Sequence, residues 1–173
     1  MANKDCGVLD AKIAEAICYG SDQLIAGKFD QEFVSDLIQG GAGTSVNMNA
    51  NEVIANIGLE YLGHKKGEYQ YLHPNNHVNC SQSTNDAYPS AFRIALYLKM
   101  ESFLTTLEEL EKAFTAKGRE FSKVLKMGRT QLQDAVPMTL GQEFGAFAVT
   151  LQKDLEQINT LIPNVLAYMN LGG

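Results

Sequence analysis

Two long heptad patterns constrain the fold of this chain more than any other feature of its sequence. Between residues 96 and 114, apolar residues recur at alternating intervals of four and three, at Leu96, Met100, Phe103, Leu107, Leu110 and Phe114. A second series has the same spacing: Phe144, Ala148, Leu151, Leu155, Ile158, Ile162, Val165 and Met169. Such spacing places apolar side chains on one face of a helix, and this face requires partner helices. The sequence therefore predicts two long helices that belong to a helical bundle.

We call the apolar face of each predicted helix its seam. The two helices cannot cover seams of this length by themselves. We therefore expect further partner helices, either from more of the same polypeptide or from other copies of it. The sequence begins almost without preamble at "MANK" and stops at "LGG", directly after the second seam. Both ends look cut, and we expect the chain to be an internal piece of a longer polypeptide.

The N-terminal part of the chain predicts shorter helices. Asp10 is a suitable N-cap for a first helix, and Gly27 stands where a terminating glycine belongs. A further helix is expected over residues 47–62, before Gly63. Between these two, four apolar residues suggest a short second helix: Phe33, Val34, Leu37 and Ile38. The expected fold class is all-α, with long helices that form part of an elongated helical bundle and a smaller helical N-terminal region.

The composition excludes several classes of protein. The 173 residues are 45% hydrophobic and 20% charged, which is ordinary for a soluble globular protein. The net charge is −6 and no basic cluster exists, so no nucleic-acid partner is expected. No apolar run approaches the ~18 residues of a membrane span, so no membrane partner is expected. The three cysteines, Cys6, Cys18 and Cys80, include no CxxC pair, which favours reduced thiols in a cytoplasmic protein.

A run of small polar residues, "SQSTND" at positions 81–86, precedes the first seam. Either Asn85 or Asp86 is the expected N-cap of the helix that follows. Ser83 and Thr84 then stand at the positive end of a long helix, where hydroxyl and backbone donors can bind a carboxylate without a cationic side chain. Simple capping explains the same residues, because Ser, Thr, Asn and Asp are the usual N-cap types. On this stretch alone both interpretations stay open.

Two further stretches have the same small, polar character. The first, "GGAGTSVNMNANE" at positions 40–52, combines glycines that let a backbone approach a ligand with Asn47, Asn49 and Asn51 at a helix start. Asparagine is a poor helix former, so we expect local polar pairing or a buried polar contact to compensate. The second, "GRTQLQD" at positions 128–134, is by itself typical of an ordinary turn.

The sequence predicts no metal site. His73 and His77 are four residues apart, but Pro74 and two asparagines lie between them, so a helical pair of zinc ligands is not expected. A nucleophile elbow of the GxSxG type is absent from the sequence. A Ser-His-Asp triad stays open, because its members need not be close in sequence.

Three segments together carry a resemblance to a known family. They are "GAGTSVNMNANEVIANIGLEYLG", "HPNNHVNCSQSTNDAYPSAFRIA" and "GRTQLQDAVPMTLGQEF", and they resemble aspartate ammonia-lyases, within the aspartase/fumarase superfamily. The similarity runs through the chain from Met1 to Gly173. The resemblance implies a homotetramer whose core is a bundle of long helices from four chains, which would supply partners for both seams. It also implies a reversible elimination of ammonia from L-aspartate that gives fumarate and needs no cofactor.

The resemblance also implies roles for residues in these segments. Thr44 and Asn85 would contact the amino end of the substrate. Ser83 and Thr84 would bind a carboxylate. Neutral donors of this kind suit a reaction in which a substrate carboxylate gains negative charge. Sites in the family are composite, because they form where different subunits meet and each subunit gives one stretch.

Thr130 and Gln131 complete the implied set of substrate-binding residues. Thr130 would hold the β-carboxylate. Gln131 stands where fumarases, and some aspartases, have histidine. Glutamine cannot exchange a proton at neutral pH, so Gln131 would orient the substrate rather than act as an acid or base. Together with Thr84, where fumarases carry a second serine, Gln131 favours an aspartase over a fumarase.

The resemblance leaves the catalytic base outside this sequence. The family signature GSSxMPxKxNP, which carries the serine base and a carboxylate-binding lysine, is absent. No catalytic residue is therefore assigned, and the isolated chain is expected to be inactive or nearly so. The implied domains are part of an N-terminal helical domain over residues 1–84 and the first part of a truncated bundle domain over residues 85–173. Two alternatives stay open: a piece of a class II fumarase, and a non-catalytic helical module for oligomerisation.

Overall fold

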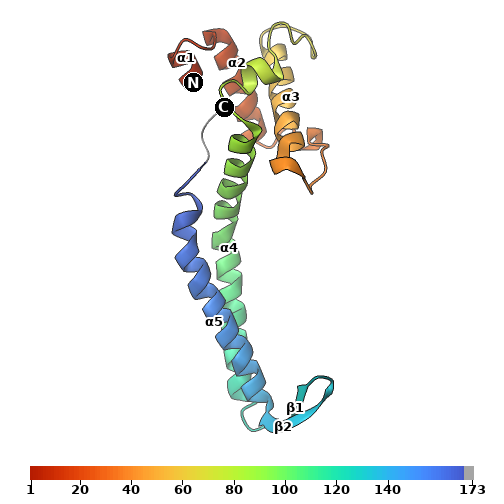
Figure 1. Ribbon diagram of the computed structural model, residues 1–173, viewed down its shortest axis with the longest axis vertical. Coiled ribbons are helices and arrows are strands. Elements are labelled where there is room, and N and C mark those ends of the chain that lie inside the picture. Colours follow the sequence, from red (N-terminus) through yellow and green to blue (C-terminus); the bar gives the residue numbers. More distant parts are fainter. Residues whose placement is uncertain (170–173) are drawn as a thin grey trace. The chain divides into compact units, whose positions relative to one another are not determined.

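A computed structural model of the chain describes residues 1–169. They form two compact units: the first comprises residues 1–92 together with residue 169, and the second comprises residues 93–168. Helices dominate both units (Figure 1), which confirms the expected mostly helical fold. No helix within the described residues is long and apolar enough to cross a membrane. The expected division between residues 84 and 85 concerns the domains of a longer protein and stays a prediction.

The first unit is built around two helices that pack against each other, α2 (Ala11–Ile25) and α3 (Thr44–Tyr61). Its shorter elements are α1 (Ala2–Asp5), the 3-10 turns η1 (Asp30–Glu32) and η2 (Gly41–Gly43), the π-helical turn η3 (Pro74–Val78) and the first turns of α4 (Thr84–Glu120). A small core of fully buried apolar side chains joins α2, α3 and the segment before η3: Ala16, Ala55, Leu59 and Leu72.

Local capping signals place α2 where the sequence predicts it. The Asp10 carboxylate accepts hydrogen bonds from the backbone N–H groups of Lys12 (2.8 Å) and Ile13 (3.4 Å), so Asp10 is the N-cap. At the other end, Gly27 adopts a left-handed conformation with φ of 71°, which residues with a Cβ atom disfavour. Both predictions for the ends of this helix are confirmed.

The short helix predicted over residues 33–38 is wrong. The chain makes one 3-10 turn, η1, and then runs without regular structure to η2. Val34, Leu37 and Ile38 are 84–96% exposed, so the described chain offers no surface that would bury the apolar face of such a helix. A helix this short does not form without packing. Instead, the Val34 N–H donates a hydrogen bond to Asn49 Oδ1 at 3.0 Å, which holds the segment against α3.

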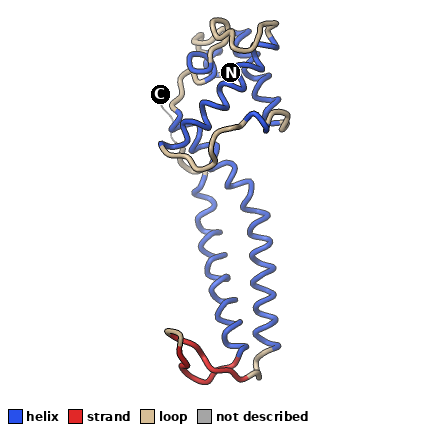
Figure 2. Tube along the Cα trace, turned by 90° about the vertical axis from the view of Figure 1, so that its right-hand side faces the viewer, coloured by secondary structure: helices blue, strands red, loops and turns tan. Residues whose placement is uncertain are grey.

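In the second unit, α5 (Leu140–Val165) runs beside the later part of α4 (Figures 1 and 2). Glycines let the two backbones approach closely. A Cβ atom added at Gly118 would lie 3.3 Å from the Gly145 nitrogen, and one at Gly141 would overlap the Gly118 carbonyl. Near this point the rings of Phe114 and Phe144 pack with centroids 5.8 Å apart. The two predicted seams therefore meet at the N-terminal end of α5.

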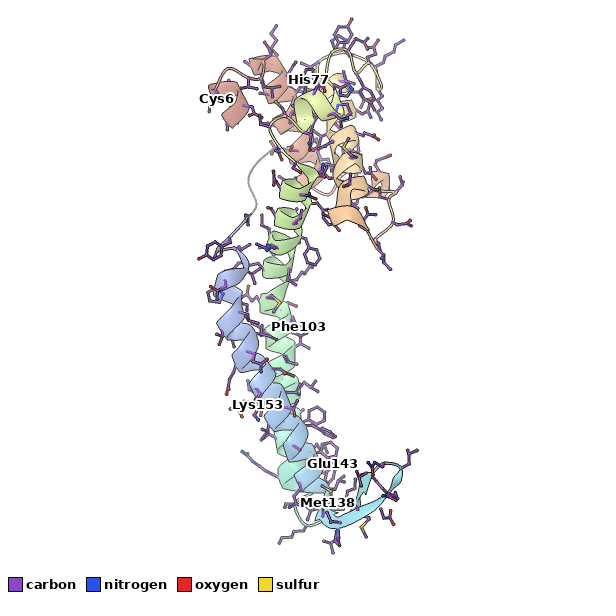
Figure 3. All side chains as sticks on the ribbon, viewed as in Figure 1. Cys6, His77, Phe103, Met138, Glu143 and Lys153 are labelled. Carbon is purple, nitrogen blue, oxygen red and sulfur yellow. The ribbon has the colours of Figure 1, made fainter. Side chains whose placement is uncertain are left out.

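The two seams differ in how far they are covered. The members within α5 are buried or half-buried: Phe144, Ala148, Leu151, Leu155, Ile158, Ile162 and Val165. Alternate members on α4 are also half-buried, namely Met100, Leu107 and Phe114. The members between them form an outer face of α4 that stays 42–50% exposed: Leu96, Phe103 (labelled in Figure 3) and Leu110. Since α5 covers only one side of the α4 pattern, the outer face still requires a partner.

A two-stranded antiparallel hairpin joins α4 to α5 (red in Figure 2). β1 (Leu125–Thr130) pairs with β2 (Gln133–Thr139), and the turn consists of Gln131 and Leu132. The sequence predicted an ordinary turn over residues 128–134 and no strands. The hairpin is therefore an addition to the all-α expectation.

The start of α5 is held by a cap and by an ion pair. The Thr139 hydroxyl accepts a hydrogen bond from the Gln142 N–H at 3.1 Å, and Gln142 Oε1 accepts one from the Thr139 N–H at 2.9 Å. This reciprocal pair is a capping box. Lys126 on β1 adds a 2.6 Å ion pair with Glu143 in the first turn of the helix. These contacts tie the hairpin to α5.

Replacing Leu132 by glycine should stabilise the hairpin. Both turn residues have positive φ, 48° at Gln131 and 62° at Leu132, as a type I′ turn requires, and neither is a glycine. The left-handed conformation costs a non-glycine residue about 1–2 kcal/mol, whereas the added freedom of glycine in the unfolded chain costs about 0.4–1 kcal/mol. We expect a net gain of about 0.5–1 kcal/mol in the free energy of hairpin opening, measured by amide hydrogen exchange in β1 and β2.

Leu132→Ala is the matched control for this variant. It removes the same exposed side chain but keeps a Cβ atom in the left-handed conformation, so it should leave the exchange rates close to those of the unmodified chain. Equal protection in the glycine and alanine variants would show that the turn carries no backbone strain.

The outer face of α4 predicts that the isolated chain self-associates, because its apolar side chains would otherwise face water. Phe103→Gln should weaken this association by removing apolar contact area. Thr105→Gln, about 200° further round the helix, should leave it unchanged. Light scattering measures both effects, and a well-folded monomer of the unmodified chain would contradict the prediction.

Candidate functional site

The polar run before the first seam forms the start of α4. The helix begins at Thr84, and the hydroxyl of the preceding Ser83 accepts a hydrogen bond from the Asn85 N–H at 3.2 Å. In return, the Asp86 carboxylate accepts one from the Ser83 N–H at 3.1 Å. The prediction that Asn85 or Asp86 is the N-cap is therefore wrong, because a serine and an acid three residues later cap each other. The Ser83 hydroxyl serves as an acceptor here, which leaves its hydrogen for a further acceptor.

Two threonine hydroxyls lie side by side at the starts of α3 and α4. Thr44 Oγ1 and Thr84 Oγ1 are 3.3 Å apart, although 40 positions separate them in sequence. The Thr44 hydroxyl also donates to the Gly41 carbonyl at 2.9 Å, so its single hydrogen is used there and Thr84 donates within the pair. Thr44 is exposed and Thr84 is half-buried, so a small ligand can reach the pair.

The polar stretches around this pair offer neutral hydrogen-bond donors. Residues 40–52 and 81–86 contain neither lysine nor arginine. Their donors are hydroxyls, amides and the backbone N–H groups that a helix start leaves without an intrahelical partner. The dipoles of α3 and α4 make both helix starts favourable for negative charge. Chemically, such a surface can bind a carboxylate.

Gly43 allows the starts of α3 and α4 to come close together. Its φ of 78° lies in the left-handed region, and a Cβ atom at this position would overlap the aromatic ring of Tyr88 on α4. Glycine meets both requirements. The sequence identified the glycines as residues that permit close approach, but it did not identify Tyr88, because no local signal links positions so far apart.

Three asparagines at the start of α3 make the polar contacts that their type predicts. Asn49 reaches back to the segment before the helix and donates to the Glu32 carbonyl at 2.9 Å. Asn47 and Asn51 are buried and both donate to Asn79, which follows η3. The expected local pairing and the expected buried contact are thus both confirmed. The sequence analysis did not identify Asn79. The only sequence feature that pointed to such a partner was the presence of asparagines at a helix start.

The last two predicted site residues, Thr130 and Gln131, belong to the second unit. Thr130 ends β1 and pairs with Gln133 across the hairpin, and Gln131 begins the turn. Both are exposed, and Arg129 and Asp134 form an ion pair beside them. The structure therefore gathers four of the predicted residues in the first unit and places the other two on the hairpin; the four are Thr44, Ser83, Thr84 and Asn85.

His73 and His77 use their ring nitrogens in hydrogen bonds around η3 (His77 is labelled in Figure 3). His73 Nδ1 accepts the N–H groups of Asn75 (3.0 Å) and Asn76 (3.3 Å), and His77 Nδ1 accepts the His73 N–H at 2.9 Å. Burial lowers the pKa of His77 below 6.5, and the neighbouring His73 lowers this pKa further. Within residues 1–169, no group of three or more His, Cys, Asp or Glu could hold a metal ion.

Gly43→Ala should strongly destabilise the first unit. The variant combines a left-handed backbone cost of about 1–2 kcal/mol with an overpacking cost of about 1–3 kcal/mol against Tyr88. Gly41→Ala is the matched control, since Gly41 has φ of 58° but no atom within 4 Å of its Cβ position. Urea unfolding should rank the unmodified chain first, Gly41→Ala second and Gly43→Ala last. Equal losses in the two variants would mean that contact with the ring adds nothing.

Comparison with known proteins links this geometry to a family of enzymes. The sequence profile of the family described as "Lyase" matches residues 1–173, the whole chain. Curated relatives named aspartate ammonia-lyase include one from Pseudomonas fluorescens, 63% identical over 172 residues, and one from Escherichia coli, 53% identical over 173 residues. Each comparison covers 99% of this chain and 36% of the relative, so the chain spans about a third of the length of these relatives. The resemblance to aspartate ammonia-lyases is thereby confirmed.

Solved structures agree with this assignment. A Brucella melitensis protein described as fumarate lyase:delta crystallin has a TM-score of 0.78 and 53% identity, and the match covers 99% of this chain and 40% of that one. A class II fumarase from Schistosoma mansoni has a TM-score of 0.72 and 34% identity, with 94% of this chain and 34% of that one covered. Because the family profile matches every residue, and relatives in sequence and in structure agree with it, the chain belongs to this lyase family.

Proposed function

We propose that this chain supplies part of the substrate site of a longer enzyme, a carbon–nitrogen lyase that reversibly eliminates ammonia from L-aspartate to give fumarate. The observation that carries the proposal is the contact between the Thr44 and Thr84 hydroxyls, 3.3 Å apart at two helix starts. The relatives named aspartate ammonia-lyase support the choice of reaction. The proposed ligand class is accordingly a small dicarboxylate.

The reaction requires a site that stabilises growing negative charge. A base removes a proton from the substrate Cβ, and the carbanion that forms places extra negative charge on the adjacent carboxylate before ammonia leaves. Donors that are held in position beforehand stabilise this charge without reorganising during the reaction. In the proposed site, the Ser83 hydroxyl donates to a substrate carboxylate. The Thr84 hydroxyl turns its hydrogen from Thr44 Oγ1 to the same carboxylate when the substrate binds, so Thr44 Oγ1 can accept a hydrogen bond from the amino end, which Asn85 also contacts.

The hairpin residues would take part in the same proposed site. Thr130 holds the β-carboxylate, and Gln131 orients the substrate through its amide, which donates hydrogen bonds but transfers no proton at neutral pH. The base serine and a carboxylate-binding lysine would come from a segment that this chain does not contain. The proposal therefore assigns substrate binding to this chain, assigns it no catalytic base, and involves no cofactor.

The proposed enzyme works as a homotetramer with composite sites. The outer face of α4 supports this view, since it presents apolar side chains that helices of other copies would cover. A cytoplasmic location is proposed as well, and the free thiols of Cys6, Cys18 and Cys80 agree with it.

A second candidate function is the hydration of fumarate to malate. The observation that favours it is the similarity to the class II fumarase from Schistosoma mansoni. Both reactions use a dicarboxylate and neutral donors, so the polar stretches suit either one. Gln131 and the higher identity to the relatives named aspartate ammonia-lyase favour the first candidate.

A chimera tests the proposed function. Residues of this chain replace the matching 172 residues of the Pseudomonas fluorescens relative, and the product is assayed with L-aspartate and with malate. We expect deamination of aspartate. Thr44→Val, which keeps the shape of the side chain but removes its hydroxyl, should lower kcat/KM by about 10- to 10²-fold, because it removes an acceptor for the substrate amino group and a hydrogen bond to a charged group contributes about 1.5–3 kcal/mol. Thr105→Val, on the exposed surface of α4, is the matched control and should have no effect.

The outcomes separate the candidates. A folded, tetrameric chimera that is inactive on aspartate contradicts the first candidate, and activity on malate alone supports the second. Loss of activity in both threonine variants, or in neither, contradicts the assignment of Thr44 to the substrate site.

A further inference from the structure

Three amides form a cluster in the first unit that the proposed chemistry does not use. Asn79 Oδ1 accepts hydrogen bonds from Asn47 Nδ2 at 3.1 Å and from Asn51 Nδ2 at 3.0 Å. Asn47 and Asn51 are each 7% exposed. Since a buried amide without a partner is costly, these bonds fix the position of Asn79 relative to α3.

The same side chain holds the turn that leads into α4. Asn79 Nδ2 donates to the Gln82 carbonyl at 2.9 Å, and the Gln82 N–H donates to the Asn79 backbone carbonyl at 3.1 Å. Asn79 therefore binds both polar backbone groups of Gln82. Between the two, Ser81 has φ of 59°, a left-handed conformation that persists for a residue with a Cβ atom only where its surroundings enforce it.

These contacts connect the two proposed substrate-binding hydroxyls. Positions 44, 47 and 51 are related as i, i+3 and i+7 in α3, so Thr44 shares a helix face with the two asparagines that hold Asn79. Thr84 follows Gln82 by two residues. A chain of contacts therefore runs from α3, which carries Thr44, through Asn79 and Gln82 to Thr84. The two threonine hydroxyls at its ends are in contact at 3.3 Å.

We infer that Asn79 is a positioning residue that sets the spacing of the Thr44 and Thr84 hydroxyls. The inference rests on the proposed function for the identity of the ligand, a dicarboxylate. An amide is suited to this position because its oxygen accepts from two donors while its nitrogen donates to a carbonyl, a combination that an ionised carboxylate cannot provide. It is also uncharged, so it adds no negative charge near donors that would meet an anion.

Asn79→Asp tests the donor of Asn79, which bonds the Gln82 carbonyl, separately from its acceptor, which bonds Asn47 and Asn51. The aspartate has the same shape and keeps an acceptor for Asn47 and Asn51, but it replaces the donor to the Gln82 carbonyl with a second acceptor. The turn should lose its hydrogen bond at the Gln82 carbonyl and open, while residue 79 stays hydrogen-bonded to Asn47 and Asn51 on α3. Asn76→Asp is the matched control, because it makes the same change of charge three residues away at an exposed side chain.

Amide hydrogen exchange in the complete 173-residue chain measures how often the turn opens, and it needs no substrate. We expect Asn79→Asp to accelerate exchange at least tenfold at Gln82, Ser83, Asn85 and Asp86, whose N–H groups are hydrogen-bonded in or next to the turn. Exchange at the core residue Leu59 should stay within twofold, which shows that the unit remains folded. Equal rates in the Asn79→Asp and Asn76→Asp variants would overturn the inference.

Asn79→Ala keeps the test decisive if the aspartate variant unfolds. It removes both the acceptor and the donor of the Asn79 side chain but adds no charge. The same amides should therefore exchange faster than in Asn76→Ala. Unchanged exchange at Gln82 and Ser83 in a folded Asn79→Ala chain would likewise overturn the inference.

Kinetics of the chimera described above distinguish this inference from the proposed function. Misplacing a binding group by about 1 Å costs on the order of 10²-fold in rate. We therefore expect Asn79→Asp to lower kcat more than it raises KM for aspartate, with kcat/KM reduced about 10²-fold relative to Asn76→Asp. Faster exchange at the turn together with unchanged kcat supports the positioning role and contradicts the assignment of Thr84 to the substrate. Unchanged exchange overturns the positioning role whatever the kinetics.

Discussion

Hydrogen bonds between two buried asparagines, Asn47 and Asn51, and the half-buried Asn79 hold together the two helix starts on which the polar surface of this chain depends. Asn79 satisfies two amides of α3 and at the same time fixes the backbone of Gln82 in front of α4. The contact is neutral throughout, so it imposes geometry without placing a charge beside the Thr44 and Thr84 hydroxyls. A salt bridge could hold the same elements, but it would compete with an anionic ligand for the donors nearby.

The second constraint on this molecule is the exposed apolar outer face of α4, which lacks a covering helix within the described residues. The α4 seam alternates between members covered by α5 and members of the outer face, because one neighbouring helix can cover only one side of a heptad pattern. The proposed composite site has the same requirement, since another copy would bring the hairpin residues Thr130 and Gln131 to the Thr44 and Thr84 hydroxyls, which already meet within one chain. If both proposals hold, the helices that complete the core also complete the substrate site, and folding, assembly and activity depend on one set of contacts.

Sequence reasoning succeeded where neighbouring residues decide the outcome. The cap at Asp10 and the spacing of the α5 seam from Phe144 to Val165 depend on groups within a few residues of one another, and the structure has them as predicted. The last predicted member of that seam, Met169, lies beyond the end of α5 and is 41% exposed. It failed for residues 33–38 and for the hairpin of β1 and β2. The first segment has apolar spacing but no surface to bury it, and the hairpin has a turn without the glycine or asparagine that usually marks one.

The sequence by itself determined the two long helices, the polar character of three stretches and, through their motifs, the resemblance to the lyase family. These properties are local, because periodicity and capping act over one or two helical turns. Only the tertiary structure decided which polar residues meet. Asn79 contacts side chains 28 and 32 positions away, and Thr44 lies against a hydroxyl 40 positions away. Such contacts follow from how α3 packs beside the turn before α4, and no short-range pattern encodes that packing.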